Sequence, residues 1–276
     1  MEIPVPRIPL GDWIEVILDW LLATLGGFFT VIRNFLEDLY ELLLWVLMTP
    51  EWWIITIVLA GLGWWLRSWQ LALGTVIGFI LIVGVNQWEN AMSTLSLVTI
   101  ATLIAVVIAI PLGILGAKSY TASKILRPVM DFMQTMPPMV YLIPALVIFR
   151  VGVVPGMVAT VIFAMAPGVR FTELGIRGVD SEVVEAGKAF GSTPGKILRQ
   201  IQLPLAMPTI MAGVNQVIML SLSMVVIAGM VGAGGLGGEV VASLNRINAG
   251  LGFESGLAVV ILAMYLDRLT SIQAKT

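Results

Sequence analysis

The polar residues of this chain are gathered into short intervals, and long apolar stretches separate them. Two of the apolar stretches, 53–66 and 69–85, have the length of short membrane spans. Lipid offers backbone amides no hydrogen-bond partners, so each span is expected to be helical. The pattern therefore predicts an all-α polytopic membrane protein. Five further stretches are expected to form the core of its helix bundle, at 91–117, 134–149, 153–171, 208–231 and 255–269.

The first 50 residues follow a different pattern. In 12–24 and 31–47, apolar residues recur at helical spacing on one face, while acids such as Asp12 and Glu37 lie off that face. Amphipathic helices of this kind suit the membrane interface better than the bilayer centre. For 31–47, a tilted span with a wet N-terminal half is the alternative. We therefore expect interfacial helices, two accessory spans and a bundle core, with bounds at 1–50, 51–90 and 91–276.

The composition supports a membrane protein and excludes several kinds of site. The chain is 58% hydrophobic, and its 12% of charged residues is roughly half the share found in soluble domains. It contains no Cys and no His, which excludes disulfides, thiolate or imidazole metal ligands and a Ser-His-Asp triad. The net charge of −2, without a basic cluster, argues against nucleic-acid binding. We expect no catalytic residue, metal or cofactor in this chain.

Prolines interrupt the first two core stretches. Each break frees backbone groups that neighbouring helices or a water-lined path must satisfy. Met136, Pro137 and Pro138 are therefore candidates for a gate in a transport pathway, and an ordinary kinked span is the alternative. The interrupting prolines are Pro111, Pro137, Pro138 and Pro144.

Two further side-chain groups have alternative interpretations. Asn215, Met219 and Ser223 share one face of a core stretch, at positions i, i+4 and i+8. They either line the pathway or bond across helices. Asp131 follows Arg127 by one helical turn, so an ion pair is expected between them at the inner surface.

The longest polar interval in the second half of the chain runs from Asp180 to Pro204. Its spacing predicts two short helices, with Gly191 ending the first and Pro194 at the first position of the second. Pro204 is expected to begin the return to apolar sequence. Exposed apolar faces predict docking onto a soluble partner, and a solvated helical loop is the alternative. The apolar side chains are Val183, Val184, Ala186, Ala189 and Phe190 in the first helix and Ile197, Leu198 and Ile201 in the second.

Within this interval, Glu185-Ala186-Gly187, then Gly191, then Ile201-Gln202-Leu203-Pro204 resemble the EAA loop of ABC-importer permeases. Gly187 stands where that pattern usually has Ala, which replaces one small residue by another. Two longer segments, 130–146 and 204–237, resemble the permeases of glycine betaine and proline betaine importers. The resemblance covers roughly residues 91–270. It assigns coupling to an ATPase to Glu185, Ala186, Gly187, Ala189, Phe190, Gly191, Ile201, Leu203 and Pro204.

The resemblance implies a five-helix type I ABC-importer permease core in a bacterial cell membrane, preceded by the two accessory spans. It implies assembly with a second permease chain, two cytoplasmic ATPases that bind ATP and Mg, and an extracytoplasmic substrate-binding protein. The implied cargo is glycine betaine or a related osmoprotectant such as proline betaine, choline or carnitine. The alternatives are a methionine- or phosphonate-type solute or, in another class, an ion-coupled secondary carrier. Such a carrier needs carboxylates at mid-span, whereas Glu173 and Asp267 lie near span ends.

The distribution of cations predicts the orientation. If the interval 180–204 is cytoplasmic, alternation of the spans places 11 of the 15 Lys and Arg residues inside. This layout puts the N-terminus outside and the C-terminus inside. The four cations expected outside are Arg7, Arg33, Arg150 and Arg246.

Two glycine-rich stretches resemble nucleotide-binding motifs. Residues 191–197 have one residue too few between their glycines for a phosphate loop, and Ile197 replaces the required hydroxyl. Residues 232–237 fit G-x-G-x-x-G but follow an apolar helix rather than a strand. We expect no nucleotide site in either, and a tight turn or re-entrant segment at the outer mouth for 232–237.

The nine Trp residues all lie at or before Trp88. A quaternary ammonium cargo would suit an aromatic cage, but span ends are also where aromatic belts occur. The belt is the favoured interpretation. Six Trp fall at the ends of predicted spans, namely Trp52, Trp53, Trp64, Trp65, Trp69 and Trp88.

Overall fold

A computed structural model describes residues 9–270 and contains no strand in that range. The predicted all-α class is confirmed. Arg7 and Lys275, two cations of the predicted orientation, lie outside the described residues. In chain order the helices are α1 (Leu10–Met48), α2 (Trp52–Leu66), α3 (Trp69–Gly84), α4 (Trp88–Lys118), α5 (Tyr120–Thr135), α6 (Pro138–Phe149), α7 (Val153–Arg177), α8 (Ser181–Ala189), α9 (Pro194–Ile197), the π-turn η1 (Leu198–Gln202), α10 (Leu203–Ser223), α11 (Val225–Gly229), α12 (Gly235–Arg246) and α13 (Ala249–Thr270).

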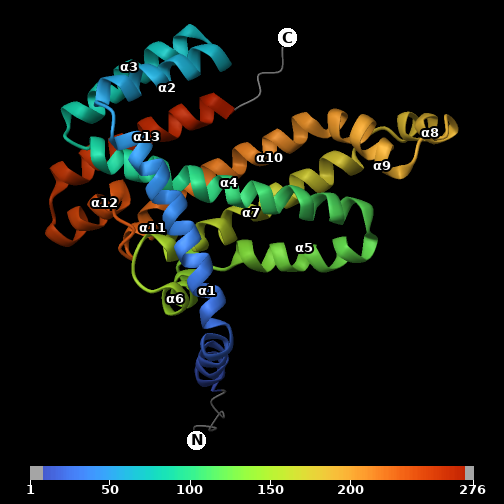
Figure 1. Cartoon of the computed structure of the whole chain (residues 1–276), viewed down its shortest axis with the longest axis horizontal. Coiled ribbons are helices and arrows are strands. Elements are labelled where there is room, and N and C mark those ends of the chain that lie inside the picture. The colour runs from blue at the N-terminus through green and yellow to red at the C-terminus, as the bar shows by residue number, and fades with distance from the viewer. Residues whose placement is uncertain (1–8, 271–276) are drawn as a thin grey trace, which may run out of the picture.

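Helices α4, α7 and α10 run side by side and form the centre of the molecule (Figure 1). Small residues allow this close approach, since Ala101, Ala105 and Ala164 are fully buried together with Val217. Within the described residues, five helices are long and apolar enough to cross a membrane: α1, α4, α7, the continuous α9 to α11 segment and α13.

The break between α5 and α6 lies at the predicted gate. The two helices meet at 97°, and together they would count as one further span. Met136 is extended, with φ −71° and ψ 135°, because a residue before proline is disfavoured in the helical region. Pro111 and Pro144, by contrast, lie inside continuous helices, so the expected interruptions at these two positions are wrong. Helix α5 was not expected, since its polar sequence lacks the apolar run of a span.

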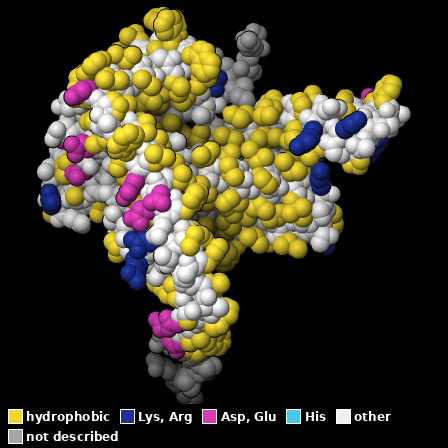
Figure 2. All heavy atoms as spheres, in the orientation of Figure 1, with side chains coloured by type: hydrophobic (Ala, Val, Ile, Leu, Met, Phe, Trp, Pro, Cys, Tyr) yellow, Lys and Arg dark blue, Asp and Glu magenta, His cyan; other side chains and the backbone are white. Residues whose placement is uncertain are grey.

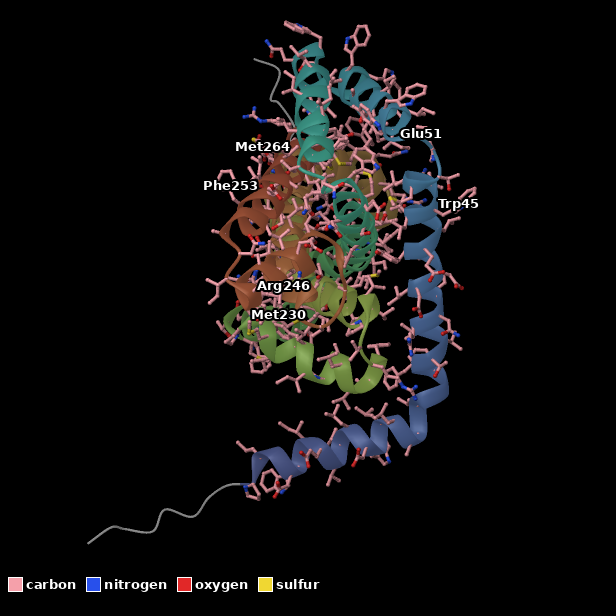
Figure 3. The ribbon with its side chains drawn as sticks, turned by 90° about the vertical axis from the view of Figure 1, so that its left-hand side faces the viewer. Trp45, Glu51, Met230, Arg246, Phe253 and Met264 are labelled. Carbon is pink, nitrogen blue, oxygen red and sulfur yellow. The ribbon has the colours of Figure 1, made fainter. Side chains whose placement is uncertain are left out.

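Residues 10–48 form one continuous helix, so the expectation of two separate amphipathic helices was wrong. Helix α1 is sharply bent, and its N-terminal part runs below the bundle and apart from it (Figure 3). The C-terminal part buries Leu36 and Leu47 and lies across α4 rather than alongside it (Figure 1). Helix α1 is long and apolar enough to span a membrane. It nevertheless runs across the bundle helices and not parallel to them (Figure 1).

Helices α2 and α3 form an antiparallel pair at the edge of the molecule, close to the bounds expected for the accessory spans (Figure 1). Trp64, Trp65 and Trp69 cluster at the turn between them and are 63–83% exposed. Trp88 instead packs edge-on against Phe79. Outward-facing rings at a helix end are typical of an aromatic belt.

The glycine-rich stretch 232–237 forms the turn between α11 and α12. Gly232, Gly234 and Gly235 all have positive φ, so the predicted tight turn is confirmed. The amide of Leu236 donates to Thr94 Oγ1 at 2.9 Å, which ties this turn to the first residues of α4.

Candidate functional site: the 181–202 hairpin and its base

Helices α8 and α9 form a hairpin that projects beyond α7 and α10 at one end of the molecule (Figure 1). Gly191 has φ +76°, the left-handed conformation that the sequence predicted, and its amide donates to the carbonyl of Lys188. Pro194 occupies the first position of α9, also as predicted. The carboxylate of Asp180 accepts from the amide of Glu182 at 2.9 Å and caps α8.

The second half of the hairpin is continuous with a bundle helix. Helix α9 passes through the π-turn η1 directly into α10, so the second short helix of the predicted hairpin is continuous with the span that follows, which the sequence pattern did not predict. Pro204 has no amide hydrogen, and its ring would crowd the carbonyl one turn earlier. The wider π-turn relieves this crowding, and the amide of Leu203 pairs with the carbonyl of Leu198. A push on α9 is therefore transmitted to α10 along one helical rod.

The predicted docking residues divide into an inner and an outer set. Gly187 is the buried residue of α8, and a Cβ there would lie 2.6 Å from Cδ1 of Ile201, so its small size lets α8 close onto η1. Leu203 packs in the cluster at the end of α7 and α10. The outer set faces away from the bundle. Its members are Ala186, Ala189 and Phe190, all exposed, with Phe190 90% exposed; Glu185 on the same helix and Pro204 at the start of α10 are also exposed.

The base of the hairpin contains an ion cluster around one buried carboxylate, which sequence reasoning missed. Glu173 on α7 has a side chain only 6% exposed. It accepts from Ser123 at 2.7 Å and Arg127 at 3.0 Å, both on α5, and Arg177 lies 3.3 Å away. Arg177 also donates to the carbonyl of Gly116 on α4 at 2.7 Å. The cluster therefore clamps α4, α5 and α7 immediately before the hairpin begins.

The expected ion pair between Arg127 and Asp131 is wrong. Arg127 reaches Glu173, and Asp131 pairs with Arg170 on α7. The helical spacing allowed the local pair, but α7 packs along α5 and offers both residues partners that sequence spacing does not show. The one sequence feature that could have indicated the Glu173 cluster was the i, i+4 spacing of Glu173 and Arg177.

The two groups of pathway candidates, one on α10 and one at the α5–α6 break, have different surroundings in the structure. Asn215 donates to Asp267 at 3.0 Å and accepts from Thr270 at 3.0 Å, so it joins α10 to α13. Ser223 donates to the carbonyl of Met219 in its own helix. These contacts favour the helix-pairing interpretation for Asn215.

Met136, from the other group, packs against the cluster that contains Tyr141, Ala159 and Met224. Pro137 and Pro138 sit at the elbow beside it. A gating role for these three residues stays a prediction.

On the face shown in Figure 2, apolar side chains cover most of the bundle, and cations gather at the hairpin end. Exposed apolar side chains on α5 and α6 include Val129, Phe132, Met139 and Ile143. Lys118, Lys196 and Arg199 line a shallow hollow next to the hairpin.

This arrangement is that of a helical membrane protein with a projecting hairpin, and comparison with known proteins identifies the family. The model of the binding-protein-dependent transport system inner membrane component family matches residues 109–274. The chain belongs to this family of ABC-transporter permeases, as the EAA-like residues predicted.

Curated relatives extend the similarity to nearly the whole chain. The chain is 50% identical over 270 residues to the glycine betaine/carnitine transport permease protein GbuB of Listeria monocytogenes, covering 96% of this chain and 95% of the relative. It is 48% identical over 265 residues to the glycine betaine transport system permease protein OpuAB of Bacillus subtilis, covering 96% and 94%. Among solved structures, the MetNI methionine ABC transporter in an inward-facing conformation matches with a TM-score of 0.59 and 22% identity, over 65% of this chain and 90% of that chain. This last likeness shows the permease fold alone.

Proposed function

We propose that this chain is the membrane-spanning subunit of an ATP-driven importer for glycine betaine or a related quaternary amine. The observation that carries the proposal is an exposed hairpin with the EAA-like residues, in a chain about half identical to betaine permeases along almost its full length. Proline betaine, choline and carnitine belong to the same cargo class. The methionine alternative is weaker, because the likeness to the methionine transporter is limited to the fold at 22% identity.

In the proposed mechanism, closure of the ATPase dimer pushes on the outer set of hairpin side chains. The push reaches α10 through the continuous α9–η1–α10 rod and reaches α7 through the short link at 178–180. The Glu173 cluster holds α4 and α5 to α7, so these helices tilt together and change the side on which the pathway is open. Differential binding of ATP to the two conformations drives the cycle.

The proposal includes partners that supply what this chain lacks. Two cytoplasmic ATPase subunits bind ATP and Mg, a second permease copy completes the pathway, and an extracytoplasmic binding protein delivers the cargo. A secondary carrier is disfavoured, since Asp267 is paired with Asn215 and Glu173 with two arginines.

We propose that the hairpin and the C-terminus are cytoplasmic and that α1 lies at the outer interface with the N-terminus outside. The support is the cation bias together with the course of α1 across the bundle. Single cysteines at Asp19, Asn248 and Ser192 can be labelled on this cysteine-free background. In intact cells an impermeant maleimide should react at positions 19 and 248 and reach position 192 only after permeabilisation. Labelling of Ser192→Cys in intact cells would overturn the orientation.

The cargo is tested by uptake into proteoliposomes that contain this chain with its ATPase and binding protein. We expect ATP-dependent accumulation of radiolabelled glycine betaine, competed by carnitine or proline betaine and unaffected by excess methionine. Liposomes with this chain alone should hydrolyse no ATP, because the hydrolytic site is expected in the partner. Accumulation of methionine instead of betaine, or betaine uptake driven by an ion gradient without ATP, would refute the proposed function.

A further inference from the structure

A groove of about 590 Å³ runs between α3 and α13, at the edge of the molecule away from the hairpin. Its floor is formed where the two helices touch, since a Cβ at Gly78 would lie 2.7 Å from Ile261. Phe79 and Tyr265 close the floor with an edge-to-face contact at 5.6 Å. The walls are mostly apolar, and Met264 on the outward side of α13 is one of them (Figure 3).

Two arginines stand together at one end of this groove. Arg67 donates through Nε to the carbonyl of Leu269 at 3.0 Å, which places its guanidinium beside the residue that follows Arg268. That bond satisfies one of the unpaired carbonyls at the end of α13, and within residues 9–270 this guanidinium makes no other hydrogen bond or ion pair. Asp267, the nearest acid in the sequence, is turned to Asn215 on α10. The described lining residues include Arg67 and Arg268 but no Asp or Glu.

The arginine end of the groove lies at the depth of lipid headgroups. Trp64, Trp65 and Trp69 surround the same turn as Arg67 and are exposed, as aromatic residues are at a membrane surface. From Gln70 to Leu81 the groove follows twelve residues of α3, and the eleven steps between them span about 16 Å at the helical rise. One leaflet of the hydrocarbon core is about 15 Å thick. The groove thus has the length of one acyl chain, with two cations where its headgroup begins.

We propose that this groove binds an anionic phospholipid, with one acyl chain between α3 and α13 and the phosphate on Arg67 and Arg268. Guanidinium groups bind phosphate oxygens through paired hydrogen bonds, and basic pockets between membrane helices at the cytoplasmic side select anionic lipids. The site would fasten the accessory pair of helices to α13 of the bundle. The choice of an anionic lipid rests on the proposed orientation, which places the two arginines at the cytoplasmic side, but on neither the proposed cargo nor an ATPase.

The test is native mass spectrometry of the purified protein titrated with phosphatidylglycerol or phosphatidylcholine. The wild type should retain phosphatidylglycerol in preference to phosphatidylcholine. Arg67→Gln with Arg268→Gln should weaken phosphatidylglycerol binding about 30-fold, since each surface cation contributes roughly fivefold to the affinity. Lys118→Gln with Lys124→Gln is the matched control, because it removes two cations from the bundle outside the groove and should leave binding unchanged.

A second variant tests the acyl-chain part without a change of charge. Gly74 lines the groove, and a Cβ added there would have no neighbouring atom within 4 Å, so Gly74→Phe can fill the space without a clash. It should lower the binding of both lipids. The proposal fails if the double arginine variant retains phosphatidylglycerol like the wild type. Inorganic phosphate is added as a competitor for the arginines. The proposal also fails if this phosphate displaces no lipid and the wild type binds the two lipids equally.

Discussion

Ala189→Asp should remove the ATPase from the purified complex. Ala189 lies in the outer set of hairpin side chains, exposed and next to Phe190, and the proposal places it in a groove of the ATPase. An aspartate there would be buried without a partner, which costs about 3 kcal/mol or more and corresponds to at least a hundredfold weaker assembly. The measurement is the amount of ATPase that co-purifies with the tagged permease.

Ala189→Ser is the control for this variant, because it changes the side chain at the same position without adding a charge. We expect it to retain the ATPase. Both variants should insert into the membrane normally, since the hairpin projects beyond the bundle. If Ala189→Asp co-purifies with the ATPase and transports like the wild type, the hairpin is a solvated loop and the coupling mechanism is wrong.

Replacing Arg127 and Arg177 together by Met should strongly destabilise the permease. The double variant leaves Glu173 buried at 6% exposure with Ser123 as its remaining partner. Breaking a buried ion pair from one side costs about 3 kcal/mol, which corresponds to roughly 10 °C in the melting temperature of a chain of this size. The measurement is thermal unfolding of the purified protein in detergent.

The cause of that loss can be separated from a general effect of removing arginines. Adding Glu173→Gln to the double variant should recover part of the melting temperature, because a neutral amide can remain buried beside Ser123. Arg170→Met breaks only the exposed pair with Asp131 and should shift the melting temperature by no more than about 2 °C. If the triple variant melts no higher than the double variant, the buried charge on Glu173 is not the cause of the lost stability.

The sequence was sufficient for the elements whose signals are local. Apolar length predicted α2, α3 and the bundle helices with bounds that differ by up to six residues, with the exception of the α5–α6 span. Gly191 and Pro194 correctly predicted the turn of the hairpin and the start of α9. Tolerance of positive φ and the lack of an amide hydrogen are properties of these residues themselves. The EAA-like residues identified the family for the same reason, since they lie close together in one loop.

The missed features depend on which helices meet. Helix α5 is too polar to resemble a span, and its ion pairs with α7 follow from packing rather than spacing. Asn215 could not be assigned to α13 from its own helix, because its partners lie 52 and 55 residues away. The continuity of α1 and of α9 through α10 was missed because Gly and Pro commonly end helices, whereas here the backbone accommodates them within a helix.

Site-specific photo-cross-linking tests the central claim most directly. Phe190 on the hairpin and Phe253 at the opposite end are both exposed phenylalanines, at 90% and 74%. Each can be replaced by the photoreactive analogue benzoylphenylalanine in the assembled transporter. The account predicts that position 190 cross-links to the ATPase subunit and that position 253 does not. An ATPase adduct from position 253, or its absence at position 190 in an active complex, would contradict the assignment of the hairpin as the coupling site.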